Sequence, residues 1–174
     1  MSVDIVKTQV PDNSQISKVL YDAYFFDVYS FHSHIKNRSS LQVWLDHAAT
    51  TPAWVNFLMA TRNRVVGLFG LKNLGALGGF DSSKPKSDYK VGDRVGIFTL
   101  LYLSDEEVVL GDSDKHLDVQ VSIFRDEIQG NFISISTVVH VHNFLGKLYM
   151  LFVKPMHKMI VPASIKRAEP TSDC

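Results

Sequence analysis

Residues 131–168 read NFISISTVVHVHNFLGKLYMLFVKPMHKMIVPASIKRA, and their hydrophobic period changes partway along. From Asn131 to His142, apolar and polar side chains alternate, which is typical of a β-strand with one buried face. From Phe144 to Ala168, apolar residues recur at helical spacing instead. We therefore expect a strand that leads directly into a long helix. Pro155 should break or kink this helix, because proline has no N–H to donate to the preceding turn.

Apolar runs of strand length also precede this strand. Short polar links separate them, and links of this length join antiparallel neighbours as hairpins. The sequence therefore predicts an antiparallel meander whose earlier strands cover Gly96–Leu103, Glu107–Asp112 and His116–Arg125.

One further strand and two helices are expected in the first half of the chain. Asp22–His34 is rich in aromatic residues and is expected to form a strand. Ser39 and Gln42 have the spacing of a capping box, which predicts a helix start at Ser39. A second helix is expected over Pro52–Phe69.

Residues 72–93 read as a long glycine-rich loop, and long loops of this kind often act as lids.

The composition is that of an ordinary globular chain, with 45% hydrophobic and 21% charged residues among 174. We expect a single domain over 1–174, with an N-terminal arm or strand over 1–20 and a disordered tail over 169–174. Eighteen basic residues balance eighteen acidic ones. Because a nucleic-acid-binding protein usually carries a basic excess, we expect no nucleic-acid partner.

Cys174 is the single cysteine, which excludes an intramolecular disulfide and a cysteine-based metal cage. The first 15 residues contain no apolar run of the kind found in signal peptides. The most apolar stretch, Phe57–Leu71, is interrupted by charged residues, whereas a spanning helix needs about 20 largely apolar ones. We therefore expect a cytoplasmic protein without a transmembrane segment.

The order strand, two helices, antiparallel strands and long helix resembles the α+β helix-grip fold of the START and Bet v 1-like (SRPBCC) superfamily. In that fold a curved antiparallel sheet wraps around a long C-terminal helix. Two stretches, 52–72 (PAWVNFLMATRNRVVGLFGLK) and 140–161 (HVHNFLGKLYMLFVKPMHKMIV), resemble a bacterial family of domains of unknown function. Some members of that family are joined to an epimerase-like dehydrogenase. The resemblance implies a helix grip and lipophilic ligand binding, but no established activity and no catalytic residues.

Seven residues are candidates for contact with such a ligand. His157 could act as an acid or base, or lie on the helix surface between two lysines. Arg62 could bind an anionic group, or belong to a salt-bridged helix face. The aromatic candidates could line a pocket, or simply fill the core. The full set is Trp54, Arg62, Phe98, Tyr102, His140, Tyr149 and His157.

Two histidine pairs could offer imidazoles to a metal, because residues two apart on a strand share a face. The pairs are His32 with His34 and His140 with His142. The alternative is that these histidines face water or bond locally, and we predict neither a metal nor a cofactor.

The leading hypothesis is a domain that binds a small lipophilic molecule in a pocket between the sheet and the C-terminal helix. The first alternative is an enzyme of the cyclase, dehydratase or isomerase type on the same scaffold. The second is a docking domain for a dehydrogenase-like partner, and a homodimer is also considered.

Overall fold

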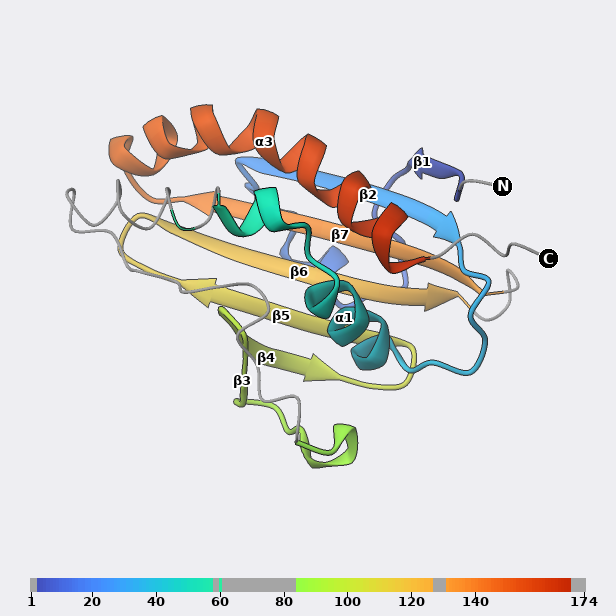
Figure 1. Cartoon of the computed structure of the whole chain (residues 1–174). Coiled ribbons are helices and arrows are strands. Elements are labelled where there is room, and N and C mark those ends of the chain that lie inside the picture. The colour runs from blue at the N-terminus through green and yellow to red at the C-terminus, as the bar shows by residue number, and fades with distance from the viewer. Residues whose placement is uncertain (1–2, 58–59, 61–83, 127–130, 170–174) are drawn as a thin grey trace.

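The computed structural model describes residues 3–57, 60, 84–126 and 131–169 (Figure 1). Within them, seven strands form one antiparallel sheet in the order β1-β2-β7-β6-β5-β4-β3. The strands are β1 (Ile5–Lys7), β2 (Phe25–His32), β3 (Arg94–Val95), β4 (Phe98–Leu103), β5 (Glu107–Ser113), β6 (Leu117–Asp126) and β7 (Phe132–Val141).

The helical elements lie on both faces of this sheet. The α-helices α1 (Ser40–Ala49) and α3 (Phe144–Ala168) cover one face, called here the inner face (Figure 1). The 3₁₀ helix η1 (Ile16–Val19) packs against the opposite, outer face through Ile16, Val28 and Val138. A second 3₁₀ helix, η2 (Lys86–Asp88), precedes β3, and residues 53–57 are also helical. The main core therefore lies between the inner face, α1 and the end of α3.

The predicted meander is confirmed, with one difference at its start. The predicted strand Gly96–Leu103 is confirmed from Phe98 on, whereas its first two residues form the turn of a hairpin in which β3 pairs with β4. Gly96 lies in the turn between them with a φ of 62°, a left-handed conformation that glycine adopts at little cost. This turn sends the chain back before Phe98, so the strand begins two residues later than predicted.

The capping box of α1 is confirmed. The Ser39 side chain accepts from the Gln42 backbone N–H, and the Gln42 side chain accepts from the Ser39 N–H. The predicted second helix is confirmed only at its start, from residue 53. Residues 58–59 and 61–83 lie outside the described residues, and they include Arg62 and most of the predicted glycine-rich lid.

The helix α3 has the bounds that its periodicity predicts, Phe144–Ala168. The helix continues through both Pro155 and Pro162, so Pro155 does not break it, and the alternative of a kink stays a prediction. Glu169, where a disordered tail was expected to begin, is 1% exposed.

Candidate functional site

Three polar side chains meet between the inner face and α3. Asp27 on β2 stands directly opposite Thr137 on β7, so both side chains point to the same face. His157 on α3 lies over this pair. Its Nδ1 is 3.2 Å from Asp27 Oδ2, and its Nε2 is 3.3 Å from Thr137 Oγ1.

The surroundings of this cluster are apolar. The ring of Phe25 lies edge-on to His157, with centroids 5.8 Å apart, and Phe25 packs with Met150 and Val139. Asp27 is 2% exposed, and its Oδ1 has no hydrogen-bond partner in the described part of the chain. A buried carboxylate needs a charged or hydrogen-bonding partner, and His157 supplies it.

Each of the two ring nitrogens of His157 has a hydrogen-bonding partner. When the Asp27 carboxylate is ionised, it accepts the hydrogen bond from Nδ1–H. Nε2 of the neutral imidazole then accepts from the Thr137 hydroxyl. Asp27 thus orients the ring, and an imidazole held by a carboxylate is an arrangement that general acid–base chemistry uses.

A groove of about 480 Å³ lies at the edge of the same interface, between β1 and the C-terminal half of α3. Tyr29 forms part of its wall and lies two residues from Asp27 on the same face of β2. Burial and the charge of Asp27 raise the pKa of the Tyr29 phenol. The groove is lined by Val3, Asp4, Ile5, Lys7, Tyr29, Pro162 and Lys166.

Two predicted pocket residues lie on the outer face, away from α3. A bulge in β4 shifts the register between Leu100 and Tyr102, so Tyr102 pairs with Val109 on the outer side. A bulge inserts one extra residue and so interrupts the alternation of faces along a strand. His140 also points outward, and its Nε2 is 3.0 Å from the Tyr21 carbonyl oxygen. These two side chains therefore lie away from the space between the sheet and α3, and their contact with a ligand stays a prediction.

The other predicted residues lie in separate places. Phe98 is buried in the main core, edge-on to Trp44 with centroids 5.5 Å apart. Tyr149 packs from α3 against the group around Met150. Trp54 is 41% exposed, and Arg62 lies outside the described residues. Only His157 joins the polar cluster, and ligand contact by the others on the inner side stays a prediction.

The histidine pairs do not gather into a ligand set. His142 pairs with Asp118 at 3.0 Å, whereas His32 lies edge-on to Phe132. Within residues 3–57, 84–126 and 131–169, no group of three or more His, Cys, Asp or Glu could hold a metal ion.

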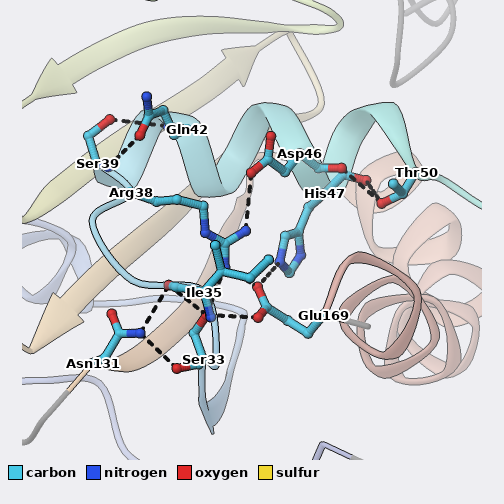
Figure 2. Close-up of polar contacts among 10 residues, drawn as sticks. All are labelled: Ser33, Ile35, Arg38, Ser39, Gln42, Asp46, His47, Thr50, Asn131 and Glu169. Carbon is cyan, nitrogen blue, oxygen red and sulfur yellow. Dashed lines mark hydrogen bonds and ion pairs between the residues drawn. The ribbon is translucent and has the colours of Figure 1, made fainter. Parts of the chain in front are cut away.

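A second buried polar cluster ties α1 to the end of α3 (Figure 2). Arg38 donates to both the Glu169 carboxylate and Asp46. Ser33 Oγ donates to Glu169 Oε2 at 2.7 Å and accepts from Arg38 at 2.7 Å. His47 Nε2 is 3.6 Å from Glu169 Oε1. Burial raises the pKa of Glu169, but His47, Arg38 and Ser33 together outweigh it and hold that pKa below its usual range.

Sequence reasoning missed Asp27 and Thr137, the partners of His157. Asp27 had a detectable signal, because it is an acid within the aromatic run FFDVYSF, on a strand with two largely apolar faces. Such a position predicts a buried carboxylate that needs a partner. The pairing of Asp27 with His157 had no local signal, since the two residues lie 130 positions apart in the chain.

These features define a class of protein: an α+β domain in which a seven-stranded antiparallel sheet carries a long C-terminal helix on one face. The model of the family described as "Protein of unknown function (DUF2867)" matches residues 19–164, and the chain belongs to this family. The expected resemblance to a family of unknown function is thereby confirmed. Comparisons with curated proteins and with solved structures found no match. Among the described helices, none is long and apolar enough to cross a bilayer.

Proposed function

We propose that this domain binds a small, largely apolar molecule between its sheet and α3. The groove between β1 and α3 carries the proposal. Its volume of about 480 Å³ falls in the usual range for small-molecule sites, roughly 300–1,000 Å³. Tyr29 in its wall adjoins the Asp27–His157 pair on the inner face.

The residues around the groove define the chemistry of the expected ligand. Val3, Ile5 and Pro162 offer apolar contact, whereas Lys7 and Lys166 outnumber Asp4 and leave a net positive charge at the solvent side. A ligand with an apolar body and a polar or anionic end fits this division. A hydroxyl or amine that reached past Tyr29 would supply the donor that Asp27 Oδ1 lacks.

A blocking substitution tests the proposal. Ile5 faces the groove, whereas its neighbour Val6 is 49% exposed and does not line it. We expect Ile5→Trp to fill the groove and Val6→Trp to leave it open, because successive strand residues point to opposite faces. Thermal unfolding is measured for both variants and the wild type across a panel of lipophilic carboxylic acids, alcohols and sterols.

We expect at least one compound to raise the thermal unfolding midpoint of the wild type and of Val6→Trp, but not that of Ile5→Trp. At a ligand concentration of about 100 times Kd, the stabilisation should approach 2.7 kcal/mol. An equal rise for Ile5→Trp would place the ligand elsewhere and contradict the proposal. A panel without any hit would also count against it.

The second candidate is acid–base catalysis on the bound molecule, favoured by the contact between Asp27 and His157. In this function His157 moves the proton and Asp27 positions the ring. We expect wild-type protein to return a bound carbonyl compound chemically changed, with a loss of roughly 10²–10⁴-fold in rate for His157→Gln. Product analysis by mass spectrometry distinguishes the two functions, because a pure binder returns its ligand unchanged in both proteins.

We further infer that the sheet and α3 form the helix grip of the START and Bet v 1-like superfamily. The order of elements supports this, since β2 is followed by α1, a further helical segment, the meander β3 to β7 and α3. A docking role beside a dehydrogenase-like partner stays a prediction, for which the exposed Trp54 and Phe57 are the natural contact.

A further inference from the structure

The solvent side of α3 carries a continuous line of exposed apolar side chains. We call Phe144, Leu148, Leu151, Phe152 and Met159 the outer stripe, and each of them is between 43% and 78% exposed. At 3.6 residues per turn, these five positions fall within an arc of about 100° and extend over about 22 Å. Soluble domains usually bury such a stripe against their own core.

The core contacts of α3 come from its other side. Met150, His157 and Ile165 face the sheet and α1, and Gly146 is buried at the start of the helix. The outer stripe is therefore a second apolar face of one helix. The packing of the described residues does not explain it, because the sheet already covers the opposite face.

The charge of α3 is entirely positive. The helix contains Lys147, Lys154, Lys158, Lys166 and Arg167, and it contains no Asp or Glu. Lys147 and Lys158 are exposed and border one edge of the outer stripe. This local excess exists although basic and acidic residues balance in the whole chain.

We propose that the outer stripe of α3 docks on an anionic lipid surface. Exposed apolar residues bordered by lysines define a helix that lies in the membrane interface, with its apolar side chains among the acyl chains and its lysines at the head groups. This surface is distinct from the groove, and its use does not depend on the proposed ligand.

Two other partners fit the surface less well. A second copy would offer it no acid from α3, and an antiparallel two-fold pairing would bring the lysine-bordered edges together. A nucleic acid needs cations at the centre of the contact, whereas here the centre is apolar and the cations lie at its edge.

The test is sedimentation of the full chain with vesicles of phosphatidylcholine containing about a third phosphatidylserine. We expect binding to these vesicles at low salt, weaker binding to pure phosphatidylcholine, and release at high salt. The double variant Leu151→Ser/Phe152→Ser should bind at least about tenfold more weakly, because it removes apolar area from the stripe. Lys147→Glu/Lys158→Glu should weaken binding by a similar factor or more.

Matched controls separate this surface from general effects of hydrophobicity and charge. Tyr21→Ser removes an aromatic side chain that is 83% exposed elsewhere. Lys86→Glu/Lys90→Glu makes the same charge change at two exposed lysines outside α3. We expect both controls to bind like the wild type, and circular dichroism checks that every variant is folded.

Three results would overturn the proposal. The wild type could remain in the supernatant with anionic vesicles at low salt. The stripe variant and the Tyr21→Ser control could bind equally. The stripe variant could instead convert a dimer to a monomer in light scattering without any change in vesicle binding, which would assign the surface to a second copy.

Discussion

Glu169 shows how one buried carboxylate makes the stability of this domain depend on pH. Burial raises its folded-state pKa, but His47, Arg38 and Ser33 outweigh burial and hold that pKa below 4.5, the ordinary value for Glu. Between those two pKa values the unfolded chain binds more protons. The stability from Glu169 is therefore fully present above about pH 4.5, and it is lost as the pH falls through the folded-state pKa.

This dependence predicts the behaviour of Glu169→Gln. At neutral pH the variant should lose about 3 kcal/mol of unfolding free energy, because Arg38 keeps only Asp46 as a charged partner. The thermal unfolding midpoint of the variant should fall by roughly 6–12 °C. Thermal melts from pH 7 to pH 3 should show this deficit shrinking in acid. The exposed Glu106→Gln serves as control, and a deficit that stays constant with pH would contradict the account.

At the scale of elements, the start of α3 depends on a glycine. A Cβ added to Gly146 would lie 2.4 Å from the His116 carbonyl oxygen and 2.9 Å from a Val141 methyl group. The same oxygen accepts the His142 N–H, so it is held in place. We predict that Gly146→Ala destabilises the domain by about 1–3 kcal/mol, despite the higher helix propensity of alanine.

Denaturant unfolding measures this effect, and the matched control lies on the same helix. Ser164→Ala changes another small side chain of α3, and substitutions away from strained positions usually stay within about 0.5 kcal/mol. A Gly146→Ala variant as stable as the wild type would show that the helix start can move away from His116 at no cost.

The elements also show which features sequence periodicity can and cannot predict. Hydrophobic periodicity predicted the bounds of β6, β7 and α3 to within about two residues. It succeeds there because the spacing of apolar residues is set by neighbours along the chain. The bulge at Leu101 has no comparable pattern, and it turned Tyr102 to the outer face. The Asp27–His157 contact needs the register of β2 on β7 and the position of α3, which no local pattern contains.

At the scale of the whole molecule, α3 presents one set of side chains to the sheet and another to solvent. The inner side packs on the sheet and places His157 over Asp27. The C-terminal half of α3 also forms a wall of the groove through Pro162 and Lys166. The outer stripe faces solvent. We propose that this arrangement lets the domain hold a lipophilic molecule in the groove while the outer stripe rests on a lipid surface.

Native mass spectrometry of protein purified from its own host tests the central claim most directly. We predict one small molecule retained per chain in the wild type and in Val6→Trp, absent from Ile5→Trp, and identified as lipophilic after solvent extraction. An empty wild-type protein, or a passenger retained equally by Ile5→Trp, would contradict binding in the groove between β1 and α3.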